Sequence, residues 1–195
     1  MGKIKRVAIV GASGVGKTTL AKHISETYGL PFISSSASDT WVQFGFKNHK
    51  DALSKCLKDP LLGKAYQKAI WELRHDALYD MPQFVTDRSP VDNYAYFLLQ
   101  QGYFSMADNK EMLEMCRKSC ENIDAFIFLR VGTQTNFQDN SKRITNVYYQ
   151  RMVDAVLKEV HQVDFHPLTV LQNTLYINNW AFSFRTEIVR DFLTK

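Results

Sequence analysis

The sequence has no long apolar run and few cysteines. No stretch approaches the ~18 apolar residues that a membrane span needs, and a strand pattern stands where a signal peptide would have its hydrophobic region. The three cysteines, Cys56, Cys116 and Cys120, leave one over in any disulfide pairing, and no nearby histidine completes a zinc set. We therefore expect a soluble, cytoplasmic protein with reduced, semi-buried thiols and no membrane partner.

Internal repeats, low-complexity tracts and Pro/Gly/Ser-rich linkers are also missing. The chain of 195 residues therefore fits a single domain, residues 1–195. A chain of this length buries roughly 70% of its extended surface, so its core needs no metal or disulfide. Lysine and arginine (24) outnumber aspartate and glutamate (20), and the net charge of +4 favours anionic partners such as nucleotides. This charge is compatible with DNA as a partner. The sequence is also compatible with a homodimer.

What the chain does contain is a phosphate-loop motif close to its start. Arg6 to Val10 is a short apolar run typical of a buried strand, and residues 11–18, GASGVGKT, fit G-x-x-x-x-G-K-[ST] at every fixed position. Leu20 and Ile24 then begin an amphipathic helix. Glycines let successive backbone N–H groups turn towards phosphate oxygens, and the helix N-terminus adds positive potential. A glycine-rich turn that binds nothing is the alternative, but the strand–loop–helix context favours a nucleotide site.

The motif assigns a set of residues to ATP. Lys17 is expected to contact the β- and γ-phosphates, and the hydroxyl of Thr18 to ligate Mg²⁺. The residues expected to hold the nucleotide are Gly11, Ala12, Ser13, Gly14, Val15, Gly16, Lys17, Thr18 and Thr19.

Strand and helix patterns alternate along the whole chain. Strands are predicted at residues 6–10, 32–34, 84–86 and 125–129, and within 168–177. Helical patterns occupy most of residues 40–80, then 91–101, 105–121, 146–161 and 180–193. This alternation is typical of an α/β protein with a parallel sheet covered by helices on both faces. Ligands in such sheets bind beyond the carboxyl ends of the strands.

Chemically useful side chains follow the predicted strands at that edge. Asp87 and Arg88 come directly after the third strand, and Arg130 follows the fourth. The Asp87 carboxylate is expected to bind Mg²⁺, directly or through water, and Arg88 to offer a bidentate donor to phosphate oxygens. The alternative is a structural ion pair or a cap for the helix that begins near Pro90.

Asp39 and Arg143 are the remaining catalytic candidates. A carboxylate after the second strand is placed to act as general base for a hydroxyl acceptor, although Asp39 also suits a cap for the helix from Thr40. Arg143 ends a polar segment, residues 131–145, which we expect to close as a lid over the triphosphate and stabilise the transition state. A solvated surface loop is the alternative.

Aromatic residues at the start of the helical stretch 40–80, and one in the helix expected at 91–101, are candidates for contact with an acceptor. Trp41 and Phe44 stand among basic residues and suit stacking on a base, and Tyr94 is a further candidate together with Arg88. Aromatic residues at this spacing also pack as core, so this assignment has a structural alternative.

With these residues identified, the chain resembles the P-loop nucleoside and nucleotide kinases, in particular the thymidylate-kinase-like group. The resemblance rests on GASGVGKT, on TDRSP after the third strand, and on an arginine-bearing lid after the fourth. It implies a three-layer α/β/α fold of the P-loop NTPase type, with a five-stranded parallel sheet in the order 2-3-1-4-5. It also implies ATP as the donor, Mg²⁺, and an acceptor held by residues 40–80.

One departure from that group bears on the acceptor. Thymidylate kinases carry an arginine near the end of the second strand that clamps the acceptor phosphate, whereas this chain has serines and Asp39 there and no arginine between Arg6 and Arg74. In this respect it is similar to deoxynucleoside kinases, polynucleotide kinases and the phage-type enzymes of DNA modification. The resemblance implies transfer of the γ-phosphoryl group to a pyrimidine deoxynucleotide, with the hydroxymethyl group of 5-hydroxymethyluracil in DNA as the leading acceptor. A kinase of free nucleoside monophosphates or deoxynucleosides is the alternative, and a P-loop NTPase switch is a third possibility.

Overall fold

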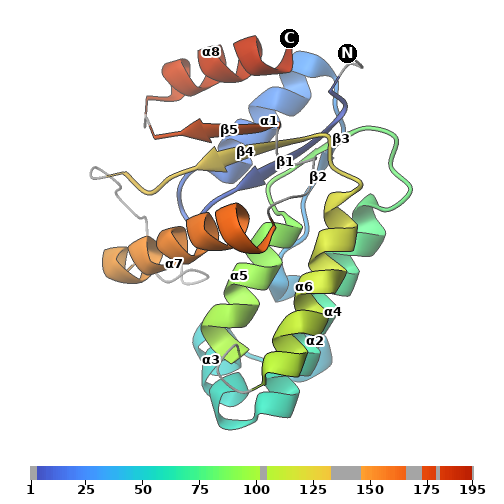
Figure 1. Cartoon of the computed structure of the whole chain (residues 1–195), viewed down its shortest axis with the longest axis vertical. Coiled ribbons are helices and arrows are strands. Elements are labelled where there is room, and N and C mark those ends of the chain that lie inside the picture. Colours follow the sequence, from blue (N-terminus) through green and yellow to red (C-terminus); the bar gives the residue numbers. More distant parts are fainter. Residues whose placement is uncertain (1–3, 102–104, 133–145, 166–172, 179–180, 195) are drawn as a thin grey trace.

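Five parallel strands form the centre of the molecule (Figure 1). The computed structural model describes residues 4–101, 105–132, 146–165, 173–178 and 181–194. The strands are β1 (Arg6–Val10), β2 (Phe32–Ile33), β3 (Phe84–Thr86), β4 (Ala125–Leu129) and β5 (Thr174–Ile177). Their order is β2-β3-β1-β4-β5 and every pairing is parallel, which confirms the predicted fold class and strand order.

The central strands are apolar because helices cover both of their faces. All five residues of β4 and all three of β3 are buried, as are the last four of β1. In register, Val7 of β1 lies beside Val85 on one side and Ala125 on the other. Continuous runs of branched and aromatic residues are typical of such doubly covered parallel strands. The carboxyl ends of β1, β3 and β4 therefore come together at one edge of the sheet.

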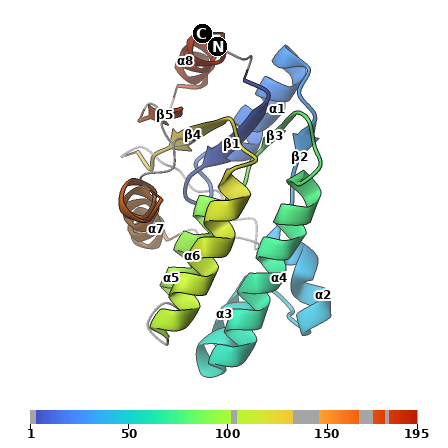
Figure 2. The same ribbon diagram turned by 45° about the vertical axis from the view of Figure 1, so that its right-hand side comes forward.

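Two groups of helices make the outer layers (Figures 1 and 2). On one face lie α1 (Lys17–Tyr28) and α8 (Phe182–Leu193), which contact each other. On the other face lie α5 (Pro90–Gln101) and α7 (Val147–Glu159), and α7 continues into a π-helical turn, η2 (Val160–Asp164). The long helices α4 (Pro60–Leu78) and α6 (Met106–Cys120) pack against α5.

The segment between β2 and β3 is helical, as predicted for residues 40–80. It contains a 3₁₀ turn, η1 (Ala37–Thr40), followed by α2 (Trp41–Phe44), α3 (His49–Lys58) and α4. Asp59 ends α3 and caps α4, because its Oδ1 accepts hydrogen bonds from the backbone N–H groups of Leu61 and Leu62. This segment has a small core of its own, formed by Phe46, Ala52, Cys56, Tyr66 and Ile70.

The three cysteines are free and fully buried, so the prediction of reduced thiols is confirmed, although they are less exposed than the sequence suggested. Burial raises the pKa of Cys56 to about 11 and also raises the pKa values of Cys116 and Cys120. These thiols are therefore protonated and unreactive at neutral pH. Within the described part of the chain, no helix combines the length and apolar content that crossing a bilayer requires.

Candidate nucleotide and acceptor site

The phosphate loop connects the end of β1 to the start of α1, and glycines with positive φ give it its shape. Gly11 has a φ of +149°, and a Cβ added there would collide with the carbonyl oxygen of Leu129 on β4. Gly16 has a φ of +92° and is the N-cap of α1. Larger residues rarely adopt these conformations. The glycines therefore let the loop pass close to β4 and turn back around the positive N-terminus of α1.

Lys17 lies across this loop. Its side chain is buried, and its Nζ donates hydrogen bonds to the carbonyl oxygens of Gly11 at 2.5 Å and Ala12 at 2.7 Å. The ammonium group is thus held inside the loop, where lysines of this motif meet the β- and γ-phosphates of a nucleotide.

Thr18 and Asp87, the two residues expected from sequence to hold Mg²⁺, are in contact. The hydroxyl of Thr18 donates a hydrogen bond to Oδ2 of Asp87, and the hydroxyl of Ser34 donates to Oδ1 at 3.0 Å. These three residues follow β1, β2 and β3, and Asp87 is buried. Hydroxyl and carboxylate oxygens are ligands that Mg²⁺ prefers, together with phosphate oxygens and water. The residues present therefore fit a magnesium ion bound beside the phosphates.

Asp92 links the start of α5 to the phosphate loop. This fully buried carboxylate accepts hydrogen bonds from the backbone N–H and hydroxyl of Ser89, at 2.9 and 2.6 Å, and from the N–H of Gly11 at 3.4 Å. Sequence reasoning missed this residue. The spacing Ser-x-x-Asp is a capping-box signal that predicts the contact with Ser89, but nothing local predicts the contact with Gly11.

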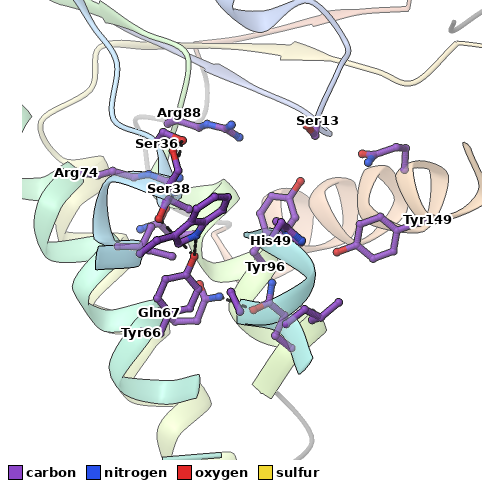
Figure 3. A pocket seen from close by; sticks show the side chains of 18 residues that line it. Ser13, Ser36, Ser38, His49, Tyr66, Gln67, Arg74, Arg88, Tyr96 and Tyr149 are labelled. Atoms are coloured by element: carbon purple, nitrogen blue, oxygen red, sulfur yellow. Dashed lines mark hydrogen bonds between the residues drawn. The ribbon is translucent and has the colours of Figure 1, made fainter. Parts of the chain in front are cut away.

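A cavity of about 200 Å³ opens next to the phosphate loop (Figure 3). Ser13 of the loop and Arg88 lie at one end, and Tyr66 and Gln67 of α4 lie at the other. Further lining residues are Ser36, Ala37, Ser38, Trp41, His49, Ala52, Leu53, Ile70, Arg74, Asn93, Tyr96, Gln100, Tyr149 and Gln150. The cavity thus joins the sheet edge to the helical segment.

The end of the cavity near the loop is positively charged. Arg74 of α4 and Arg88 both line it, and the described lining includes no aspartate or glutamate. Burial, together with the neighbouring charge of Arg88, lowers the pKa of Arg74 to about 10, so the guanidinium remains protonated at neutral pH. One of its nitrogens donates to Oδ1 of Asn93, and its Nε is buried without a hydrogen-bond partner among the described residues. Asp92 and Asp87 lie close enough to offset part of this charge, but neither lines the cavity, so the two guanidiniums at its wall suit an anionic ligand.

The far end of the cavity carries amide and aromatic groups. Nε2 of Gln67 donates to Oε1 of Gln100 at 2.7 Å, and both side chains are buried. Nε1 of Trp41 donates to the hydroxyl of Tyr66 at 3.0 Å. His49 also lines the cavity, and burial lowers its pKa, so its imidazole is neutral at pH 7. Gln67, Gln100 and His49 were not among the residues predicted from sequence.

Of the expected acceptor residues, Trp41 and Arg88 line the cavity but Phe44 and Tyr94 do not. Phe44 packs on Phe46 and Tyr66 in the small core. Tyr94 is buried and packs against Phe165 on the other side of α5. Residues two apart on a helix point in nearly opposite directions, so Tyr96 reaches the cavity where Tyr94 turns away.

Asp39 does not line the cavity either. It is exposed, and its Oδ2 accepts a hydrogen bond from the backbone N–H of Ser36 at 2.8 Å, within a capping box at the start of η1. The structure therefore favours the capping role over the expected role as general base, and Ser36 and Ser38 line the cavity instead.

Of the two arginines expected after β4, Arg130 differs from expectation and Arg143 stays a prediction. Arg130 does not join the site, because its guanidinium is paired with Asp154 of α7 at 2.7 Å. Arg143 and most of the expected lid, residues 133–145, lie outside the described residues.

A comparison with known protein families assigns the chain to one of them. A family model described as "AAA domain" matches residues 6–175. The chain belongs to this AAA-domain family. No curated protein matches the AAA-domain chain in sequence.

Several solved structures share the fold. Deoxyadenosine kinase from M. mycoides with bound dCTP is similar, with a TM-score of 0.66 and 16% identity over 96% of this chain and 98% of that one. NadR in complex with NR gives a TM-score of 0.67 and 13% identity over 98% of this chain and 52% of that one. Shikimate kinase from Acinetobacter baumannii gives a TM-score of 0.51 and 15% identity over 98% and 94% of the two chains. At these identities the likeness is one of fold.

Proposed function

We propose that this AAA-domain protein transfers the γ-phosphoryl group of ATP to a nucleoside or nucleotide held in the cavity beside the phosphate loop. The observation that carries the proposal is the continuity of the site, because Ser13 and Arg88 line the same cavity as Tyr66 and Gln67. A phosphoryl group bound by the loop and an acceptor in the cavity would be neighbours, as in-line transfer requires. The kinases among the structures of similar fold add support.

On the donor side, the chain would bind the triphosphate through Lys17 and the backbone N–H groups of the loop. Thr18 and Asp87 would hold Mg²⁺, which would neutralise charge on the phosphate oxygens. Ser34 would keep the Asp87 carboxylate oriented, since it donates to the oxygen that Thr18 does not use.

On the acceptor side, the amide pair suits the edge of a nucleobase. The bond between Gln67 and Gln100 uses the amide nitrogen of the first and the oxygen of the second. Oε1 of Gln67 therefore offers an acceptor, and Nε2 of Gln100 offers a donor. Nucleobases present adjacent donors and acceptors on their edges, so this pair would fix the orientation of a base, with Trp41 and Tyr96 on the cavity wall.

Two acceptors fit this description. The resemblance to phage-type enzymes of DNA modification implies the hydroxymethyl group of 5-hydroxymethyluracil in DNA, and the positive charge of Arg74 and Arg88 would suit the phosphates of a nucleic acid. A free pyrimidine nucleoside monophosphate is the second candidate. It is favoured by the same two guanidiniums and by the outward position of Asp39, because a phosphate acceptor needs a cationic clamp more than a base.

A labelling experiment separates these acceptors. The protein is incubated with Mg²⁺ and ATP labelled at the γ-phosphate, together with DNA that contains 5-hydroxymethyluracil, matched thymine DNA, thymidine, or thymidylate. Label in the modified DNA alone supports the first acceptor, and labelled thymidine diphosphate supports the second. Labelled thymidylate from thymidine would indicate a deoxynucleoside kinase. Release of phosphate without transfer to any acceptor would contradict the kinase proposal and favour an NTPase switch.

A further inference from the structure

Arg185 reaches the phosphate loop from the C-terminal helix. It lies on α8, which packs beside α1 on the face of the sheet opposite α5 (Figure 1). Its side chain is only 3% exposed, and its Nη1 donates a hydrogen bond to the carbonyl oxygen of Val15 at 2.8 Å. The same nitrogen would lie 3.0 Å from a Cβ added to Gly16. The guanidinium is therefore packed directly against the peptide that joins Val15 to Gly16.

The geometry of a peptide bond gives this contact a consequence inside the loop. The bond is planar and trans, so the C=O of Val15 and the N–H of Gly16 point in opposite directions. By holding the carbonyl oxygen on the outer side of the loop, Arg185 directs the Gly16 N–H to the inner side, where such loops bind phosphate oxygens. Gly16 has a φ of +92°, and glycine allows many other orientations of this peptide. The hydrogen bond from Arg185 to the carbonyl oxygen of Val15 selects one of these orientations.

A buried charge at this position also calls for an explanation. Removing a guanidinium from water is costly, and an apolar side chain of similar size would fill the same space without that cost. Burial lowers the pKa of Arg185, as is expected for a guanidinium withdrawn from water. A charged donor makes a stronger and more polarising hydrogen bond than a neutral one, and it adds positive potential behind a loop that receives phosphates.

We propose that Arg185 is a positioning residue of the phosphate loop, which orients the Val15–Gly16 peptide for phosphate binding. The proposal rests on nucleotide binding by the loop, as set out above, and does not depend on the identity of the acceptor. It makes the C-terminal helix part of the nucleotide site, although Arg185 is 170 residues away from Val15 in sequence.

The test is ATP binding by the full chain without any acceptor, measured by titration calorimetry in the presence of Mg²⁺. The variants are Arg185→Met, Arg185→Lys and the control Arg190→Met. Arg190 lies on the same helix, is exposed, and its guanidinium pairs with the adjacent Asp191, so its loss removes the same charge away from the loop. Arg185→Met is expected to weaken ATP binding about tenfold, Arg185→Lys less, and Arg190→Met less than about twofold.

A second measurement reports on the peptide itself. The chain has nine glycines, so selective ¹⁵N-glycine labelling resolves the Gly16 amide in a simple spectrum. Saturating Mg·ADP is expected to move this amide proton strongly downfield in the wild type and in Arg190→Met, and much less in Arg185→Met. A purely structural Arg185 would instead lower the melting temperature and leave both the ATP affinity and the Gly16 shift unchanged.

The outcomes distinguish the two proposals. Equal ATP affinity and equal Gly16 shifts in wild type and Arg185→Met would overturn the role of Arg185 alone. A wild type that binds no ATP would overturn nucleotide binding by the loop and the role of Arg185 with it. If Arg185→Met does not fold, Arg185→Lys carries the test: weaker ATP binding at an unchanged melting temperature supports the proposal, and wild-type affinity contradicts it.

Discussion

The two ends of the candidate site are built in different ways. At the sheet edge, a continuous stretch of chain forms the phosphate loop, and backbone geometry at Gly11 and Gly16 shapes it. In the cavity, side chains from separate helices meet, among them Arg74 of α4 and Tyr96 of α5. A loop made by local backbone conformation tolerates few alternatives, whereas a cavity made by packed helices changes with each side chain that lines it. We therefore expect substitutions at the loop to abolish activity and substitutions in the cavity to alter selectivity.

The largest effect is expected for Lys17→Met. The substitution removes the ammonium that lies inside the loop while keeping a side chain of similar length. We expect phosphoryl transfer to fall about 1000-fold, because charge on the transferring group would lose its direct stabilisation. Initial rates with labelled ATP measure this, and an unchanged melting temperature controls for folding. Activity near the wild-type level would show that the loop is not the donor site.

A smaller loss is expected for Asp87→Asn. The amide keeps the shape of the side chain and one oxygen but loses the negative charge next to Thr18. We expect kcat to fall about 100-fold and the Mg²⁺ concentration for half-maximal activity to rise, since the metal would lose its charged protein ligand. A magnesium titration of both proteins checks this. A lower kcat with an unchanged magnesium requirement would leave Asp87 with a structural role only.

Arg74→Met sharpens the comparison, because it tests the cavity without touching the loop. We expect kcat/KM for the acceptor to fall about tenfold, with little change in the KM for ATP, as one charge-assisted contact is lost. Lys68→Met on the same helix is the control, since Lys68 does not line the cavity. The fall in kcat/KM should be larger for an acceptor that carries a phosphate than for one that does not. Equal falls in kcat/KM for thymidine and thymidylate would argue against an anionic subsite.

The smallest effect is expected for Asp39→Asn. Because the carboxylate caps η1 and is exposed, we expect kcat to change less than about twofold and stability to fall by at most about 1 kcal/mol. Kinetics with saturating ATP and a thermal melt measure the two quantities. A large fall in kcat at unchanged stability would instead restore Asp39 as the general base and favour a hydroxyl acceptor.

The strands and the phosphate loop could be predicted from sequence because their signals are local. β3 and β4 begin and end at the predicted residues, since apolar runs bounded by polar ones mark strands buried on both faces. That Thr18 and Asp87 lie close together could be predicted, because parallel strands bring their carboxyl ends to one edge of the sheet. A capping role for Asp39 was also visible as an alternative, although for a helix from Thr40 and not for the turn Ala37–Thr40 that it caps together with Ser36.

By itself, the sequence determined the parallel sheet, the loop and the charged residues at the strand ends, because glycine conformation, strand burial and helix polarity act over a few neighbouring residues. Only the tertiary structure decided that Tyr96 and not Tyr94 faces the cavity, that Arg74 comes beside Arg88, and that Arg130 is paired with Asp154. The physical reason is that the direction of a side chain follows from how its helix packs on distant elements. Arg185 is the clearest case, because only the packing of α8 beside α1 brings it to Val15.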